Sequence, residues 1–491
     1  MKNILVATIG TRDLMLQLSS GQWYNVGDDQ MQDGEIIGEQ AEVISDLGLG
    51  QTTFRDLTQY LLDGIEDYRS RLKPIIIGKL LADQAQALEQ VYLIGTDQAV
   101  GIPQRKKDTV HACAIIKDWL VHNYSVPVEI ITLGAKGENP SNFEQMFRWW
   151  RHMWRETIQP PPDQPILLCL KGCVAQTAEA GRISGLSAYG DRIQFFDFIQ
   201  NTEVNRRGMP SDYTGPILGT NYLWDRTQQQ ALKLLDRYDY AGTEALLQPY
   251  FQQDPQGFKA LPSQIKAGIA WNQGQFETFF QRVKGSLTPQ AQQQSTKYWQ
   301  VAYEQAQLSV VRLQQQNTTE AMLSSFRAVE GLLWLWAVKT FPTDVTARTD
   351  QYPVLKQSIC RKYPQLSSQV DFNFNARYPD TAQLQAKVLR SLLEAAIPQT
   401  ATSPDFKEFW DKAKTKRNTY SHRLGGLTER EVFNAWGDDI KQQRQWENRI
   451  LNCLNLITGQ SFKGLTQASL FSAMHEQVKA AIAQYQPPSP H

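Results

Sequence analysis

The chain has 491 residues, 41% of them hydrophobic and 20% charged, and its 50 Lys and Arg residues balance its 50 Asp and Glu residues. A single hydrophobic core stops growing at about 250 to 300 residues, so this length predicts two or three domains, and the composition excludes a disordered chain. The zero net charge provides no long-range attraction for a polyanion, so a nucleic-acid site would have to be a local patch.

The cysteines and the apolar segments indicate the compartment. Five scattered cysteines lack the even, dense spacing of a secreted disulfide framework. The start MKNILVATIG has no basic segment followed by an apolar leader, and the most apolar stretch, GLLWLWAV at 331–338, is far shorter than the roughly 20 residues that cross a bilayer. We therefore expect a cytoplasmic protein without a membrane segment, in which 331–338 belongs to a core helix.

Up to about residue 200, short β-rich apolar runs alternate with amphipathic stretches of helical length. This pattern is typical of repeated βαβ units and predicts an α/β fold with a doubly wound, mostly parallel sheet. The predicted strands are residues 4–9, 75–77, 91–94, 128–133, 166–170 and 193–198. The predicted helices are residues 54–72, 109–123, 142–156 and 174–189.

The pattern changes after residue 200. Gly, Pro, Asn and Asp accumulate over 201–221, which indicates a boundary, and beyond Trp224 the apolar spacing is helical with no convincing strand. We predict an α/β domain at 1–222, a helical connector at 223–300 and an all-α domain at 301–491.

Four predicted strands are followed by loops that carry Gly beside a polar or cationic residue. The loops are Gly10-Thr11-Arg12-Asp13, Gly95-Thr96-Asp97, Gly134-Ala135-Lys136-Gly137 and Lys171-Gly172-Cys173. Open α/β sheets bind ligands at the carboxyl ends of their strands, and this combination suits a ligand with several phosphates. The alternative is that each Gly serves only a turn. Neither G-x-G-x-x-G after a strand nor a P-loop motif occurs, which argues against a nicotinamide enzyme or a P-loop ATPase.

The segment FKEFWDKAKTKRNTYSHRLGG at 406–426 combines an apolar helical stripe with the densest cationic cluster of the sequence. RNA cleavage without a metal needs a proton-transfer group and charge stabilisation on the phosphorane. His422 suits the first role, Arg417 offers bidentate phosphate contact, and Asn418 can orient either partner. On a regular helix Arg417 faces away from the other two, so we expect a distorted helix end or a second subunit. The alternative is a solvated basic helix end.

Together these segments resemble the CARF–HEPN ribonucleases associated with type III CRISPR systems. The resemblance rests on VATIGTRD, on KKDTVHA at 106–112, on LKGCVAQ, on FRAVEGLL and on RNTYSH, which matches the HEPN R-x4-H motif. It implies a homodimer whose CARF pair binds cyclic oligoadenylate and whose HEPN pair cuts single-stranded RNA without a metal or another cofactor. Arg417, Asn418 and His422 would then be catalytic.

The same resemblance implies which residues bind the messenger. We expect them to be Gly10, Thr11, Arg12, Thr96, Asp97, Lys136, Lys171, Gly172 and Gln176. Cyclic tetra-adenylate is favoured over hexa-adenylate, but Lys171 to Gln176 replaces a Gly-Gly-Thr-type loop of many relatives and leaves the ring size open. Arg327 and Glu330 would either support the active site or pair with each other along their helix.

Two rival functions remain open. The first is a cyclic-nucleotide-binding regulator without RNA cleavage, and the second is an α/β domain that degrades its own ligand, a ring nuclease. A metal site is not expected, because His111 with Cys113 and Cys169 with Cys173 lack a recognised ligand spacing.

Overall fold

The computed structural model describes residues 2–27, 31–32, 35–36, 39–162, 164–347, 353–372 and 379–487. The chain divides into two compact units, Met1–Asp225 with the last residues of the chain, and Arg226–Tyr485. The division lies close to the predicted boundary at 222, within helix α9 (Gly219–Asp236). The second unit includes both the connector and the all-α domain predicted from the sequence, and their separation stays a prediction.

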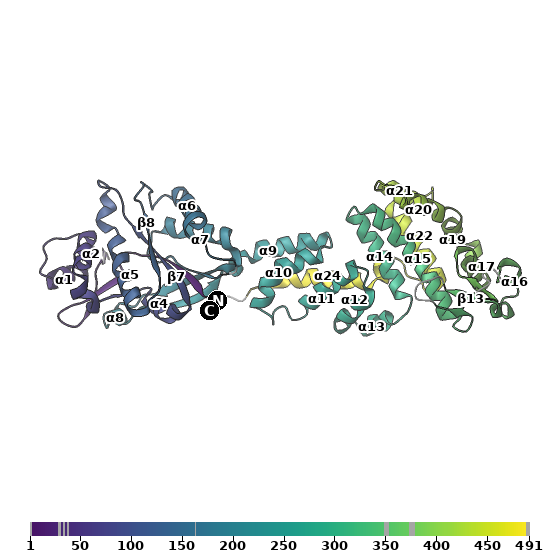
Figure 1. Cartoon of the computed structure of the whole chain (residues 1–491), viewed down its shortest axis with the longest axis horizontal. Helices are drawn as coiled ribbons and strands as arrows, with labels where there is room; N and C mark the ends of the chain where they lie inside the picture. Colours follow the sequence, from purple (N-terminus) through teal and green to yellow (C-terminus); the bar gives the residue numbers. More distant parts are fainter. Residues whose placement is uncertain are drawn as a thin grey trace. The chain divides into compact units, whose positions relative to one another are not determined.

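A six-stranded sheet forms the centre of the first unit (Figure 1), with the strand order β11-β10-β9-β1-β7-β8. Five strands are parallel, and β11 pairs antiparallel with β10 at one edge. The bounds are β1 Asn3–Thr8, β7 Leu88–Thr96, β8 Val128–Leu133, β9 Ile166–Cys169, β10 Ile193–Ile199 and β11 Asp212–Leu218. From β1 the chain proceeds outward through β7 and β8 and then returns to β9 on the other side of β1. This confirms the predicted doubly wound, mostly parallel sheet.

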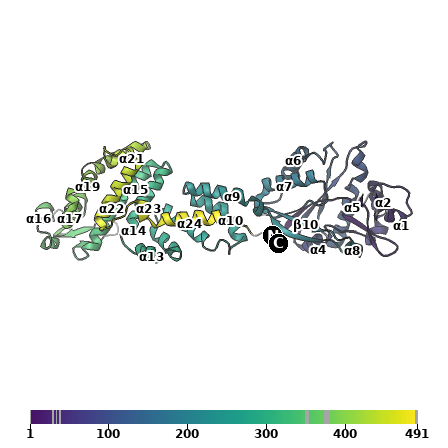
Figure 2. The same ribbon diagram turned by 180° about the vertical axis from the view of Figure 1, so that it is seen from behind.

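Helices cover both faces of this sheet, and β1 shows why its sequence is continuously apolar. Leu5 and Ala7 pack with α2 (Phe54–Asp63), α4 (Gly78–Gln84) and α5 (Val110–Tyr124). Ile4 and Val6 point to the opposite face and pack with α6 (Phe143–His152) and α7 (Ala175–Tyr189). Figures 1 and 2 show α6 and α7 on one side of the sheet and α4 on the other. A strand buried on both faces cannot show the alternation of a half-exposed one.

Three local expectations for this unit need correction. The predicted strand at 75–77 is a buried bend, and the pairing residues precede it in β6 (Leu72–Pro74), which belongs to a separate antiparallel sheet with β2 (Leu14–Gln17) and β3 (Trp23–Asn25). The predicted helix at 54–72 is interrupted at Gly64. The segment 201–221, predicted as a boundary, contains β11, and the first unit extends beyond it to Asp225. The remaining short elements are β4 Met31–Gln32, β5 Glu35–Ile36, α1 Glu39–Asp46, α3 Ile65–Tyr68 and α8 Thr202–Asn205.

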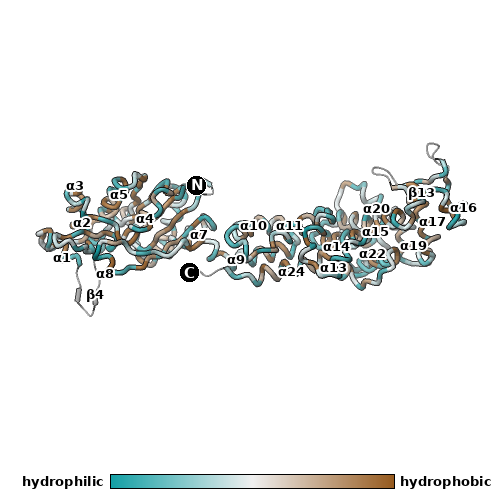
Figure 3. The backbone as a smooth tube through the Cα atoms, turned by 90° about the horizontal axis from the view of Figure 1, so that it is seen from below, coloured by the Kyte–Doolittle hydropathy of each residue, from teal (hydrophilic) through white to brown (hydrophobic). Residues whose placement is uncertain are grey.

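The second unit is helical, as predicted. Its helices are α10 Tyr240–Gln253, α11 Leu261–Asn272, α12 Phe276–Val283, α13 Pro289–Ser295, α14 Gln300–Gln314, α15 Thr318–Thr340, α16 Leu366–Gln369, α17 Ala386–Ala396, α18 Gln399–Thr402, α19 Pro404–Glu408, α20 Lys414–Ser421, α21 Glu429–Trp436, α22 Gln443–Thr458, α23 Leu465–Ala468 and α24 Leu470–Gln484. Figure 3 shows hydrophobic and hydrophilic residues interspersed along these helices, as in amphipathic helices. The expectation that this half contains no strand is wrong, because β12 (Val345–Thr346), β13 (Val354–Lys356) and β14 (Thr381–Gln383) form a small antiparallel sheet.

Helix α15 contains the most apolar stretch of the sequence. Within the described ranges it is the one helix whose length and composition would allow it to cross a membrane, and 61% of its most apolar window is buried inside the structure. Leu332, Leu333 and Trp336 belong to the largest core cluster of this unit. The helix is therefore part of the core, as predicted for 331–338.

Candidate functional site

A pocket of about 800 Å³ opens in the first unit at the carboxyl ends of β1, β7, β8 and β9. The loops that follow these four strands all contribute to its lining, with residues such as Gly10, Thr96, Gly134 and Lys171. The strand order reverses between β1 and β9, which is where an open α/β sheet binds ligands. The pocket therefore lies where the sequence predicted a ligand site.

Two glycines bring the loops after β1 and β9 into direct contact. A Cβ atom on Gly10 would lie 2.8 Å from the carbonyl oxygen of Gly172, and one on Gly172 would collide with the carbonyl oxygen of Thr8. Both residues also line the pocket. These glycines thus serve close packing and pocket lining at once, and backbone atoms form this part of the wall.

The first loop is held from beneath by a buried acid that the sequence analysis did not assign. Asp13 is fully buried, and its Oδ2 accepts a hydrogen bond of 2.6 Å from the Gly10 N–H. Its Oδ1 has no hydrogen-bond partner among the described residues. Burial raises the pKa of Asp13 to about 7. The hydrogen bond from the Gly10 N–H to Asp13 therefore fixes the orientation of this loop.

One side of the pocket is formed by residues 98–107, which connect β7 to α5 and which we call the cap. Its contribution to the lining comprises Gln98, Ala99, Ile102, Pro103, Gln104 and Lys107. Thr96 and Thr109 close the base of this connection, since each backbone N–H donates to the hydroxyl of the other residue, at 3.0 and 3.2 Å. No sequence pattern predicted the cap, although KKDTVHA covers its last two residues.

Six of the nine residues predicted to bind the messenger line the pocket: Gly10, Thr11, Arg12, Thr96, Lys171 and Gly172. The other three lie elsewhere. Asp97 forms an ion pair of 2.9 Å with Arg55, Lys136 is exposed, and Gln176 is exposed on α7. Beside the cap, the polar lining residues that were not among those predicted include Thr8, Asp13, Thr109, Glu138, Asn139, Ser141, Thr177 and Gln200.

In the second unit, Arg417 is held by an acid from another helix. The two terminal nitrogens of its guanidinium lie 3.1 and 3.2 Å from the carboxylate oxygens of Glu330 on α15. The guanidinium also lies over the Phe326 ring, 5.7 Å from its centroid. Of the two alternatives for Arg327 and Glu330, pairing with each other is wrong, because Arg327 pairs with Glu320 at 2.7 Å. Glu330 instead fixes the orientation of Arg417.

Asn418 and His422 lie on the exposed end of α20. His422 is the residue at which the helix ends. The backbone carbonyl oxygen of Asn418 accepts a hydrogen bond of 3.0 Å from the Ser421 hydroxyl. A π-helical turn, Phe409–Ala413, directly precedes α20. A helix distortion was one of the two routes by which we expected Arg417 to approach the other residues. Among the described residues, no hydrogen bond or ion pair joins Arg417, Asn418 and His422 to one another; Asn418 and His422 are exposed, whereas Arg417 is held by Glu330.

Three cations of this segment, Lys416, Arg417 and Arg423, are paired with acids. Lys416 pairs with Asp438, and Arg423 lies 2.7 Å from Glu431. The hydrogen bonds from Arg423 are the main cause of a lowered pKa of Glu431, at about 2. The local positive potential is therefore weaker than the sequence alone indicated.

Comparison with known proteins finds a similar solved structure but no similar sequence. No family model matches the sequence, and no curated protein matches it. The solved structure of Enterococcus italicus Csm6 bound to cyclic hexa-2′-fluoro-hexa-dAMP matches with a TM-score of 0.57 and 14% sequence identity, over 98% of this chain and 100% of that chain. This chain has the CARF–HEPN fold of Csm6. In the CARF–HEPN fold, the pocket at the strand ends belongs to the α/β part, and the RNTYSH segment belongs to the helical part.

Proposed function

We propose that this protein is an endoribonuclease of type III CRISPR defence that cyclic oligoadenylate activates. The messenger binds in the pocket of the first unit, and the second unit then cuts single-stranded RNA without a metal. The observation that carries the proposal is the pocket at the switch in strand order, in a chain with the fold of a protein solved with a cyclic adenylate analogue.

The chemistry of the pocket supports a ligand that combines phosphates with apolar rings. Arg12, Lys107 and Lys171 contribute cationic side chains, and the isoleucines of the lining offer apolar surface to an adenine. These isoleucines are Ile9, Ile76, Ile94 and Ile102. We propose that two copies pair in a homodimer and bind one ring between their pockets, with tetra-adenylate as the favoured ring.

The proposed cleavage uses Arg417, Asn418 and His422 from both copies. His422 accepts the proton of the RNA 2′-hydroxyl, whose oxygen then attacks the adjacent phosphorus. Arg417 stabilises the charge that develops on the phosphorane, and Asn418 orients the phosphate. The bond to the 5′-oxygen breaks, that oxygen takes up a proton, and a 2′,3′-cyclic phosphate remains. The role of Glu330 is to present the guanidinium of Arg417.

The test is cleavage of a fluorescent single-stranded RNA in EDTA, with and without cyclic tetra- or hexa-adenylate. We compare the wild type with His422→Ala and with His152→Ala, which removes an exposed histidine of the first unit. We expect messenger-dependent cleavage that falls at least about 100-fold only in His422→Ala. Cleavage that survives in His422→Ala would move the active site away from α20. Messenger binding without cleavage would favour a regulator, and a linearised messenger would identify a ring nuclease.

A further inference from the structure

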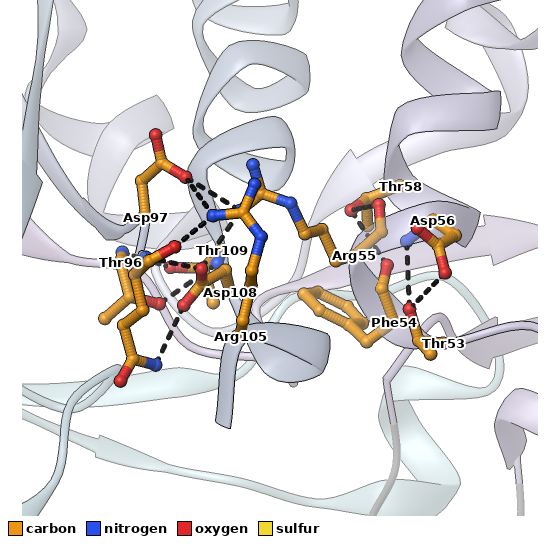
Figure 4. Close-up of polar contacts among 11 residues, drawn as sticks. Thr53, Phe54, Arg55, Asp56, Thr58, Thr96, Asp97, Arg105, Asp108 and Thr109 are labelled. Carbon is orange, nitrogen blue, oxygen red and sulfur yellow. Dashed lines mark hydrogen bonds and ion pairs between the residues drawn. The ribbon is translucent and has the colours of Figure 1, made fainter. Parts of the chain in front are cut away.

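The cap is anchored to helix α2 by a network of arginines and aspartates (Figure 4). Nη1 of Arg55, on α2, lies 2.9 Å from Oδ1 of Asp97 and 3.0 Å from Oδ2 of Asp108. Nη1 of Arg105, in the cap, lies 3.4 Å from the same oxygen of Asp97. One guanidinium group thus joins α2 to the residues on both sides of the cap.

Asp108 also closes the cap on itself. Its side chain is fully buried and accepts two hydrogen bonds from Gln98, one of 2.6 Å from the backbone N–H and one of 3.0 Å from the side-chain amide. Arg105 donates a further hydrogen bond to the Gln98 carbonyl oxygen. Gln98 begins the cap and Asp108 follows its last residue, so these bonds fix the base of the loop. Charge-assisted hydrogen bonds of this kind are stronger than neutral ones.

The tip of the cap is more exposed than its base. Val100 is 89% exposed and Ile102 is 44% exposed, although Ile102 also lines the pocket. Arg55 itself is absent from the pocket lining, and its side chain is only 16% exposed. Arg55 therefore acts on a ligand through the position of the cap and not by direct contact.

We propose that Arg55 is a positioning residue that holds the cap in place at the side of the pocket and so sets how long a bound ligand stays. The identity of the ligand as a cyclic oligoadenylate rests on the proposed function. An interaction that must break before a ligand leaves acts mainly on the dissociation rate, and a loop ordered in advance lowers the entropic cost of binding. If the ribonuclease is active only while the messenger is bound, Arg55 also sets the duration of RNA cleavage.

The first experiment follows hydrogen exchange without any ligand, in Arg55→Gln and in Arg69→Gln. The control breaks a similar ion pair of the same unit, in which Arg69 lies 2.8 Å from Asp118 and is 26% exposed, outside the pocket lining. We expect faster exchange over residues 98–108 in Arg55→Gln only. Asp97→Asn, which removes one partner of Arg55 and leaves the buried Asp108 pair intact, is expected to give the same pattern more weakly. Unchanged exchange over residues 98–108 in both Arg55→Gln and Asp97→Asn would overturn the anchoring role of Arg55.

The second experiment measures dissociation of cyclic tetra- and hexa-adenylate by surface plasmon resonance, from the same variants and from Arg55→Lys. Loss of a charged hydrogen bond predicts dissociation about tenfold faster in Arg55→Gln, with little change in association, and a smaller effect in Arg55→Lys. Faster exchange with an unchanged dissociation rate would overturn the effect on ligand residence. A wild type that binds neither ring would reject the proposed function, and the exchange experiment would then decide the role of Arg55 by itself.

Discussion

The contact between Arg417 and Glu330 shows how much of the candidate nuclease site depends on one pair of side chains. A planar guanidinium and a carboxylate fit each other through two parallel hydrogen bonds, which fixes direction as well as distance. Arg417 is 22% exposed and Glu330 is 30% exposed, so the pair contributes little to stability. Its effect is to hold the guanidinium of Arg417 in one orientation against α15.

We predict that Glu330→Gln lowers the rate of RNA cleavage about tenfold, because one fixed hydrogen bond of the fork is lost and the guanidinium is less well oriented. Glu320→Gln is the matched control, since Glu320 pairs with Arg327 on the same helix. Single-turnover cleavage at saturating messenger is the measurement. Equal rates in Glu330→Gln and the wild type would exclude the orienting role.

Sequence reasoning located this site only in part, and the reason is visible in the same pair. The motif pointed to Arg417, Asn418 and His422 because they are close in sequence. Glu330 is 87 positions from Arg417, and its three-residue spacing from Arg327 suggested a local partner. Packing of α20 against α15 overrides that spacing. The role of Arg55 in the first unit likewise depends on distant contacts, with Asp97 and Asp108, that no local pattern reveals.

Among the elements, Glu304 on α14 holds together helices that are distant in sequence. Its buried carboxylate accepts hydrogen bonds from Trp271 Nε1 on α11 at 2.9 Å, from Gln300 Nε2 at 2.8 Å, and from the Ser469 hydroxyl and the Leu470 N–H at 2.7 Å each. The last two groups lie at the start of α24, where backbone N–H groups lack partners within the helix. Burial raises the pKa of Glu304, and these four hydrogen bonds oppose that shift.

Glu304→Ala is therefore expected to destabilise the second unit by about 3 to 5 kcal/mol, because it leaves several buried donors without an acceptor. Glu277→Ala, at an exposed position on α12, should have little effect. Urea unfolding followed by tryptophan fluorescence is suitable, since Trp271 stacks on Phe471 at 3.6 Å between ring centroids. A loss as small as that of Glu277→Ala would show that α24 does not depend on this carboxylate.

The elements that the sequence predicted well are strands of the central sheet. Strands β1 and β9 are buried on both faces because helices cover them on either side, whereas β8 and β10 combine buried apolar residues with the exposed Glu129 and Asp197. Ile75 to Ile77 are also apolar and buried, but they form a bend, so burial alone does not identify a strand. Strand β11 escaped prediction because it lies at an edge, is largely exposed and contains Gly215 and Pro216.

At the scale of the whole molecule, two buried groups give the units opposite responses to pH. Asp13 in the first unit has a pKa raised to about 7 by burial, so its contribution to stability is lost as the pH rises from about 4 to 7. His475 in the second unit has a pKa lowered to about 4, mainly by burial, and its ring nitrogen Nδ1 lies 2.7 Å from the Tyr240 hydroxyl. Its contribution is lost as the pH falls from about 6.5 to 4.

We therefore predict that raising the pH from 4 to 7 weakens the contribution of Asp13 and strengthens that of His475, by up to roughly 3 kcal/mol each. Hydrogen exchange resolved by unit measures both contributions in one sample. Asp13→Asn should remove the first trend and His475→Phe the second, while each leaves the other unit unchanged. Parallel pH trends in both variants and the wild type would contradict the assignment.

The contact between Gly10 and Gly172 bears on how proteins of this architecture can diverge. At the point where the strand order reverses, the wall of the pocket consists of main-chain atoms, which every amino acid possesses. Apart from small residues at the point of contact, such a wall places few demands on the identity of the side chains around it. A sequence comparison scores side-chain identities, whereas a comparison of coordinates scores the path of the chain. The path of this chain can therefore match that of a solved protein at 14% identity, while no family model and no curated protein matches its sequence.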